Sequence, residues 1–231
     1  MISAILLAAG LSKRMGCDKL LLEYNGKTLL QHAVGLLCDL PCEEKILVVT
    51  PERQSSVESV DLSAGVSPEE VSPGGVSLVG SSVGGISVVI NSESHKGQSE
   101  SVKLGLSSSE LRGSGDFYLF LNADQPRLTC DSLSGLLELA KNHPDKIIYP
   151  IVNGAPASPT LFPVRFRGEL LELRGDTGGK VVRDAHPGDC VGFEVKEEDA
   201  WEFADIDTME DYQLLGRVAT TENWPKIVPL E

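Results

Sequence analysis

The sequence predicts an α/β protein built on a mostly parallel sheet with helices on both faces. Apolar runs rich in β-branched residues alternate along the chain with segments of helical spacing, which is typical of parallel strands joined by helical crossovers. The chain has 231 residues, of which 41% are hydrophobic, so it is long enough to bury a substantial core. We expect one domain over residues 1–217 and a C-terminal tail over residues 218–231.

Five segments have the composition of buried strands, and three segments have the spacing of amphipathic helices. The strand segments are Ile2–Leu7, Lys45–Thr50, Ile86–Ile90, Phe117–Leu121 and Lys146–Ile151. The helical segments are Thr28–Asp39, Ser99–Glu110 and Asp131–Asn142. Sheets of this class bind ligands at the carboxyl ends of their strands, near the point where the strand order reverses. We therefore expect the loops after the first and fourth strands to line a site.

Two regions interrupt this alternation. Residues 54–85 are dominated by Ser, Gly, Val and Pro, which predicts a low-complexity surface insertion, with a functional lid as the alternative. From Val152 onward, short strands, turns and helical pieces are mixed. Here we expect a small β-rich extension that covers one side of the pocket and returns to the main sheet. The tail after Gly216 has no clear periodicity, and its role stays open.

Charge and composition exclude several classes of partner. The formal net charge of -14 argues against general nucleic-acid binding, which depends on basic surfaces. An anionic substrate would need a focused basic pocket, a divalent metal, or both. No apolar run approaches the ~20 residues of a membrane-spanning helix, and the N-terminus lacks a basic leader. The five cysteines include no C-x-x-C motif, so we expect a cytoplasmic protein.

The loop after the first strand concentrates glycines and cations in an otherwise acidic chain. It runs from Leu7 through Ala8, Ala9, Gly10, Leu11, Ser12, Lys13, Arg14 and Met15 to Gly16, and Lys19 follows. It is neither a Walker loop, because Leu20 follows the lysine, nor a G-x-G-x-x-G motif. Its N–H groups and cations could bind a triphosphate while the Ala8-Ala9 backbone contacts a base. A tight turn with solvated basic residues is the alternative.

Two carboxylates further along the chain are candidate ligands for Mg²⁺. Asp124 follows the buried run Phe117–Leu121, at the end of a strand, and Mg²⁺ favours one or two carboxylates together with substrate phosphates. Asp205 and Asp207 project to the same side of an extended segment, just before a predicted helix. Ordinary turn chemistry explains Asp124 equally well. Capping of the following helix by Asp207 or Thr208 is the simpler interpretation of the second segment.

Three further segments could contact a ligand. The segment Arg174–Lys180 opens a predicted helix and could hold the phosphate of a second substrate. The segment Gly97–Ser101 could approach a base or sugar, and the turn Asn153–Pro159 could line an acceptor pocket. Plain turns and caps explain each of these segments as well. The four histidines show no ligand spacing and no Ser/His/Asp arrangement is evident, so nucleophilic or acid–base catalysis by the protein has little support.

The order of these motifs resembles the nucleotidyltransferases that mature the molybdenum cofactor, within the MobA-like NTP transferase family. The chain contains L-A-A-G-x-S-x-R-M-G-x-x-K, Asp-Gln-Pro after an apolar strand, G-D-x-G, and D-I-D-T-x-E-D-Y, over roughly Met1 to Leu215. Its Leu-Ala-Ala-Gly opening is most similar to the cytidylyltransferase branch, because guanylyl-transferring relatives have Leu-Ala-Gly-Gly. The resemblance implies a Rossmann-like three-layer nucleotidyltransferase fold.

The resemblance also implies a reaction, in which CMP passes from CTP to the terminal phosphate of molybdopterin and pyrophosphate is released. The alternatives are a cytidylyltransferase for an isoprenoid, sugar or polyol phosphate, and a non-catalytic nucleotide-binding accessory protein of a molybdenum hydroxylase. By this resemblance the catalytic residues are Arg14, Lys19 and Asp124, and Asp124 with Asp207 would hold Mg²⁺. The nucleotide-binding residues would be Leu7, Ala8, Ala9, Gly10, Ser12, Arg14, Lys19, Gln98, Ser99 and Ser101. The acceptor-binding residues would be Asp176, Gly178 and Lys180.

Overall fold

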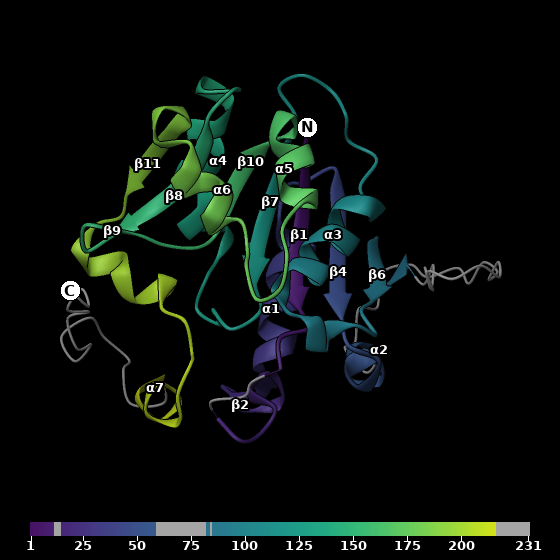
Figure 1. The fold of residues 1–231 in the computed structure, drawn as a ribbon. Helices are drawn as coiled ribbons and strands as arrows, with labels where there is room; N and C mark the ends of the chain where they lie inside the picture. Colours follow the sequence, from purple (N-terminus) through teal and green to yellow (C-terminus); the bar gives the residue numbers. More distant parts are fainter. Residues whose placement is uncertain (12–14, 59–81, 84, 216–231) are drawn as a thin grey trace, which may run out of the picture.

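The computed structural model describes residues 1–11, 15–58, 82–83 and 85–215. Within these ranges, one mixed sheet of nine strands forms the centre of the molecule (Figure 1). Its strand order is β11-β8-β10-β7-β1-β4-β6-β5, and β9 pairs with β8. The middle of the predicted low-complexity insertion and the whole predicted tail lie outside the described residues, as do Ser12 and Arg14.

Four parallel strands make up the first half of the sheet. They are β1 (Ile2–Ala8), β4 (Glu44–Val49), β6 (Ile86–Ile90) and β7 (Phe117–Asn122). β1 pairs with β4 on one side and with β7 on the other, and β6 adds to β4. The chain therefore builds outward from β1 to β6 and then returns to the opposite side of β1. This reversal of strand order lies between β1 and β7, where α/β sheets bind their ligands.

The second half of the sheet is mixed. It consists of β8 (Ile147–Val152), its short hairpin partner β9 (Ala155–Pro156), β10 (Thr160–Pro163) and β11 (Cys190–Glu194). β10 runs antiparallel between β7 and β8, whereas β11 is parallel to β8. The β-rich part after Val152 thus returns to the main sheet, as the sequence predicted. A separate hairpin is formed by β2 (Glu23–Tyr24) and β3 (Lys27–Thr28), and β5 (Ser82–Val83) pairs with β6.

Helices cover both faces of the sheet and complete three layers. One face carries α1 (Leu29–Asp39) and α4 (Cys130–Asn142), and the other carries α3 (Gln98–Ser108), α5 (Arg167–Leu171) and α6 (Lys180–Ala185) (Figure 1). The strand side chains alternate between the two layers: in β1, Ala4 and Leu6 pack under α1, and Ile5 packs under α3. The predicted fold class is confirmed, and so are the five predicted strands and three predicted helices, within a few residues at each end.

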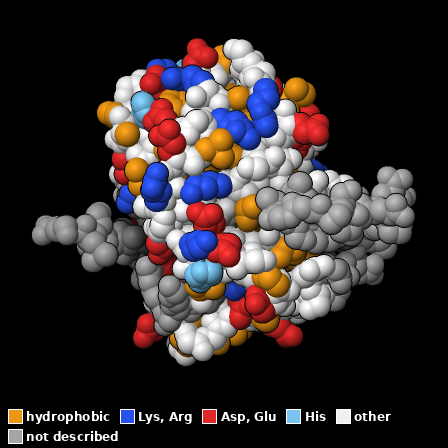
Figure 2. Space-filling model, turned by 45° about the vertical axis from the view of Figure 1, so that its right-hand side comes forward, with side chains coloured by type: hydrophobic (Ala, Val, Ile, Leu, Met, Phe, Trp, Pro, Cys, Tyr) orange, Lys and Arg blue, Asp and Glu red, His pale blue; other side chains and the backbone are white. Residues whose placement is uncertain are grey.

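The remaining described α-helices are short. They are α2 (Gln54–Glu58), within the predicted insertion, and α7 (Met209–Leu215), near the end of the described chain. No helix in the described part of the chain is long and apolar enough to cross a membrane. Figure 2 shows acidic side chains beside many of the basic ones on one face of the molecule. The ion pair between Lys103 and Glu100, at 2.9 Å, is an example of this pairing.

Candidate active site

Two adjoining cavities open at the carboxyl ends of β1 and β7, at the reversal of strand order. Their volumes are about 400 and 410 Å³. The first lies beside the loop after β1 and is lined by Ala9, Gly10 and Lys19, among others. The second lies toward β10 and α6 and is lined by Thr160 and Lys180, among others. Both cavities are lined by Leu7, Gln98, Asn122 and Asp176, so these four residues form the boundary between them.

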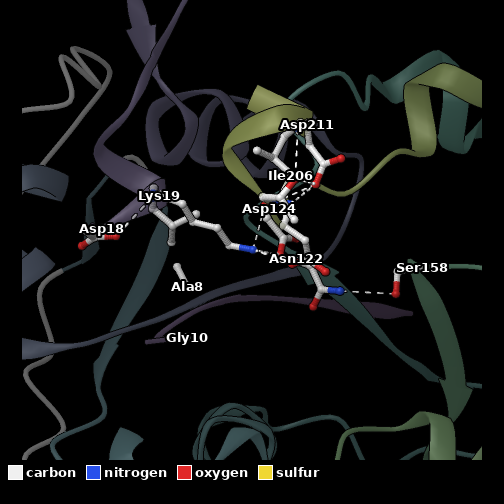
Figure 3. A network of polar contacts seen from close by, with 12 residues as sticks. Ala8, Gly10, Asp18, Lys19, Asn122, Asp124, Ser158, Ile206 and Asp211 are labelled. Atoms are coloured by element: carbon white, nitrogen blue, oxygen red, sulfur yellow. Dashed lines mark hydrogen bonds and ion pairs between the residues drawn. The ribbon is translucent and has the colours of Figure 1, made fainter. Parts of the chain in front are cut away.

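Lys19 joins the two candidate metal ligands. Its ammonium donates to Asp124 Oδ2 at 2.7 Å, to Asp207 Oδ1 at 3.0 Å and to the main-chain oxygen of Ile206 at 2.8 Å. Figure 3 shows the lysine side chain extending from the end of the loop toward Asp124. Burial alone would lower the pKa of Lys19, but the charges and hydrogen bonds of Asp124 and Asp207 outweigh this effect and raise it. Lys19 is therefore a fixed cation.

One carboxylate oxygen of Asp124 is available to a ligand. Its Oδ2 binds Lys19, whereas its Oδ1 is buried and has no hydrogen-bond partner among the described residues. A buried carboxylate oxygen without a partner is costly unless a ligand supplies positive charge. Asp207 is about half exposed, so its carboxylate also faces the first cavity.

The site holds more negative than positive charge. Asp205 opens onto the second cavity, whereas Asp207 opens onto the first. Partial loss of hydration at the cavity wall, together with the charges of Asp124 and Asp207, raises the pKa of the Asp205 carboxyl above its ordinary value. No cluster of three or more His, Cys, Asp or Glu that could hold a metal occurs in the part of the chain that the structure describes. The donor set is therefore two carboxylates, which suits Mg²⁺ completed by substrate phosphates and water.

Asp207 is held in place by the cap of α7. Thr208 Oγ1 accepts from the N–H of Asp211 at 3.1 Å, and the Asp211 carboxylate accepts from the N–H groups of Thr208 and Asp207 at 2.7 and 3.0 Å. The Ile206 N–H also donates to the Asp124 main-chain oxygen at 2.9 Å. Capping, predicted for Asp207 or Thr208, is thus performed by Thr208 and Asp211, and the Asp207 carboxylate binds Lys19 instead.

Two segments that the sequence predicted separately meet at the start of α3. The N–H of Ser99 donates to the Gly175 main-chain oxygen at 3.1 Å, and the N–H of Gln98 donates to Asp176 Oδ1 at 3.4 Å. A Cβ on Gly97 would lie 2.3 Å from the Gly175 backbone, so this approach requires glycine. The predicted nucleotide segment and the predicted acceptor segment therefore form one wall of the two cavities.

The predicted site residues divide into three groups. Those that line a cavity are Leu7, Ala9, Gly10, Lys19, Gln98, Ser101, Asp124, Asp176, Gly178, Lys180 and Asp207. Ala8 and Ser99 are buried and line neither cavity. The main-chain oxygen of Ala8 faces Arg53, and Ser99 belongs to the contact with Gly175. Ser12 and Arg14 lie outside the described residues.

Asn122 and Gln125 are functional candidates that sequence reasoning left without a role. Asn122 lies on the boundary of the cavities and donates to Ser158 Oγ at 3.3 Å, pointing away from Lys19 (Figure 3). Gln125 is buried and donates to the main-chain oxygens of Ser158 and Phe203 at 3.2 and 2.7 Å. These amides tie the Asp124 loop to the turn before β10. The sequence did contain one signal for these two residues, since both follow a predicted buried strand closely.

Residues 4–190 match the model of the MobA-like NTP transferase domain, which is most of the chain. This chain belongs to the MobA-like NTP transferase family. The purine catabolism protein PucB of Bacillus subtilis (strain 168) is 28% identical over 218 residues, which cover 92% of this chain and 95% of PucB.

Solved structures share the fold over nearly the whole length. Rv0371c from Mycobacterium tuberculosis H37Rv has a TM-score of 0.66 at 21% identity, covering 94% of this chain and 98% of that chain. A complex of Rv0371c with manganese has a TM-score of 0.64 at 20% identity, covering 94% and 98%. A nucleotidyl transferase from Methanothermobacter thermautotroptrophicus has a TM-score of 0.65 at 20% identity, covering 94% and 96%. This member of the MobA-like NTP transferase family thus has the Rossmann-like fold of these structures.

Proposed function

We propose that this MobA-like protein transfers CMP from CTP to the phosphate of a molybdopterin-type acceptor, with release of pyrophosphate, in the cytoplasm. The observation that carries the proposal is the cluster of Lys19, Asp124 and Asp207, which lines the first of two adjoining cavities. A fixed cation and two acidic ligands in one cavity, with a second cavity adjoining it, suit the transfer of a phosphoryl-linked group from one ligand to another.

The first cavity is the proposed nucleotide site. Lys19 and the backbone of Gly10 face the position proposed for the triphosphate, and we assign Ser12 and Arg14 to the triphosphate on the resemblance of the motif alone. Leu7, Ala9, Gln98 and Ser101 would surround the base and ribose. The choice of cytidine rests on Ala9, because guanylyl-transferring relatives have glycine at this position of the motif.

The second cavity is the proposed acceptor site. Lys180 lines it, and Arg183 reaches it from α6 with its guanidinium 4.9 Å from the Tyr149 ring centroid. Arg183 is paired with Asp184 at 2.9 Å, so Lys180 is the proposed source of the positive charge that a phosphorylated acceptor needs in a chain whose net charge is -14. Asp176 and Gly178 belong to the same wall. A molybdenum hydroxylase that receives the product is the proposed client.

Asp124 and Asp207 would hold Mg²⁺. Bound there with phosphate oxygens, the ion would neutralise charge that develops around the α-phosphate. In the transfer, an oxygen of the acceptor phosphate bonds to the α-phosphorus, the bond from that phosphorus to the bridging oxygen breaks, and pyrophosphate leaves. The protein holds both substrates in line and stabilises the leaving group with Lys19, so its contribution is positioning and electrostatics.

Release of pyrophosphate tests the proposal. Purified protein is assayed with CTP, GTP, ATP and UTP, each with molybdopterin and, separately, with isoprenoid, sugar and polyol phosphates. The expected result is turnover with CTP and molybdopterin. Turnover with CTP and another phosphorylated metabolite favours the second cytidylyltransferase assignment. Nucleotide binding without pyrophosphate release under every condition would instead identify an accessory protein.

A further inference from the structure

Arg53 is almost fully buried beneath the loop that follows β1, and no sequence motif assigned it a role. It ends the short helix Pro51–Arg53, directly after β4, and only 4% of its surface is exposed. A buried guanidinium is stable only where hydrogen bonds and a counter-charge replace its hydration. Its partners therefore identify what it holds in place.

The guanidinium of Arg53 binds both ends of the loop. Nη1 donates to the main-chain oxygen of Ala8 at 2.5 Å, and Nη2 donates to that of Gly10 at 2.8 Å. Nε and Nη2 also donate to the two carboxylate oxygens of Asp18, each at 2.7 Å. Asp18 in turn caps the turn Lys19–Leu21. One side chain thus connects the start of the loop to the segment that carries the catalytic lysine.

These contacts determine which way the peptide units of the loop face. In a trans peptide, a carbonyl oxygen and the following N–H point to opposite sides. Because the oxygens of Ala8 and Gly10 point to Arg53, the N–H groups of Ala9 and Leu11 point away from it. Ala9 and Leu11 both line the first cavity. Main-chain N–H groups that face a common space bind the oxygens of phosphates.

We propose that Arg53 is a positioning residue for the phosphate-binding loop. It draws two carbonyl oxygens away from the first cavity, turns the N–H groups of Ala9 and Leu11 toward the triphosphate, and fixes Lys19 through Asp18. The proposal rests on the nucleotide binding proposed above, and it concerns the triphosphate rather than the base or the acceptor. Lysine cannot take this role, because a single ammonium does not reproduce the planar fork that reaches four oxygens.

Binding of inorganic triphosphate with Mg²⁺ tests this role, because the probe lacks a base and a ribose. Affinities are measured by titration calorimetry for wild type, Arg53→Lys and Asp18→Asn. We expect each variant to bind about 10- to 100-fold more weakly, since each loses charged hydrogen bonds that orient the loop. In turnover, the KM for the nucleotide should rise by a similar factor while the KM for the acceptor stays the same. The double variant, which combines Arg53→Lys and Asp18→Asn, should bind triphosphate only slightly more weakly than the single variant with the lower affinity.

Arg167→Lys is the matched control. Arg167 is also partly buried and donates through Nη2 to a main-chain oxygen, that of Leu106 at 3.0 Å, but it lines neither cavity. Equal triphosphate affinity in wild type and a folded Arg53→Lys would overturn the proposal. If Arg53→Lys does not fold, an unchanged affinity in Asp18→Asn would overturn it instead.

The two proposals fail in different ways. If both variants bind triphosphate more weakly while wild type prefers a nucleotide other than CTP, the role of Arg53 is supported and the assignment of cytidine is overturned. If wild type binds neither inorganic triphosphate nor any of the four nucleotides, both proposals are overturned.

Discussion

Asp124 divides its two carboxylate oxygens between a lysine and an open position. Oδ2 accepts from Lys19, and the buried Oδ1 has no partner among the described residues. We expect Asp124→Asn to lower pyrophosphate release about 100-fold, because an amide neither binds a divalent cation strongly nor balances the lysine charge. Asp131→Asn, which changes an exposed acid at the start of α4, is the control and should retain full turnover. Full turnover in Asp124→Asn would contradict the metal assignment.

Lys19 occupies the space between the two proposed metal ligands. We expect Lys19→Gln to weaken nucleotide binding about tenfold, because it removes a charged hydrogen-bond donor to phosphate. The same variant should bind Mn²⁺ more tightly in the absence of nucleotide, since the ammonium no longer competes for Asp124 and Asp207. Titration of Mn²⁺ followed by electron paramagnetic resonance measures this effect. Weaker Mn²⁺ binding in the variant would show that the lysine does not compete with the ion.

At the scale of single residues, the sequence identified the acids and the lysine because they belong to short local motifs. Arg53 could not be found in this way, since its partners Gly10 and Asp18 lie 43 and 35 positions away along the chain. A charged residue after a strand is usually solvated, and only burial reveals its role. Asn122 was equally hidden, because its contact with Ser158 spans 36 positions.

At the scale of elements, two capping boxes offer a matched pair of variants. Thr28 caps α1 and Thr208 caps α7 through the same kind of hydrogen bond. Thr28→Ala and Thr208→Ala should each lower the free energy of unfolding by about 1 kcal/mol, as measured by urea denaturation. Only Thr208→Ala should also raise the Mg²⁺ concentration needed for half-maximal turnover, because its cap holds Asp207. An unchanged Mg²⁺ requirement would count against a role for α7 in the site.

The contact between α3 and the segment after α5 allows a second test. Gly97 has a φ of 113°, and a Cβ there would meet the Gly175 backbone. Gly97→Ala should lower the free energy of unfolding by about 2 kcal/mol, because both the conformation and the space exclude a side chain. Gly35→Ala, in α1 where a Cβ meets no atom within 4 Å, is the control and should not destabilise the protein. Thermal melts of wild type and of both variants measure these changes in stability.

The long elements were predictable because their apolar residues form a continuous run or recur with a helical period. β1 and β7 are nearly continuous apolar runs of strand length, and α4 is long enough for its helical period to be recognised. The hairpin β2–β3 was not predicted, since two-residue strands contain no period. The sequence indicated short strands after Val152, but it could not indicate that β10 enters the sheet between β7 and β8, because pairing between distant strands leaves no local pattern.

At the scale of the whole molecule, the charge balance predicts dependence on a divalent cation. The chain carries a net charge of -14, and the substrates proposed for it are also anionic. Removal of metal with EDTA should abolish pyrophosphate release, and added Mg²⁺ or Mn²⁺ should restore it. The melting temperature should rise when nucleotide and metal are present together, because both bind the folded state. Turnover that persists in EDTA would contradict this prediction.

The position of β10 also has a consequence for the order in which the molecule assembles. β8 joins the first half of the sheet only through β10, a strand of four residues that follows it in the chain. During synthesis, the sheet of β1, β4, β6 and β7 has all its strands once Asn122 has been made, but β8 must wait for Pro163. Thr160 of β10 lines the second cavity, so ligand binding there requires this later strand to be in place.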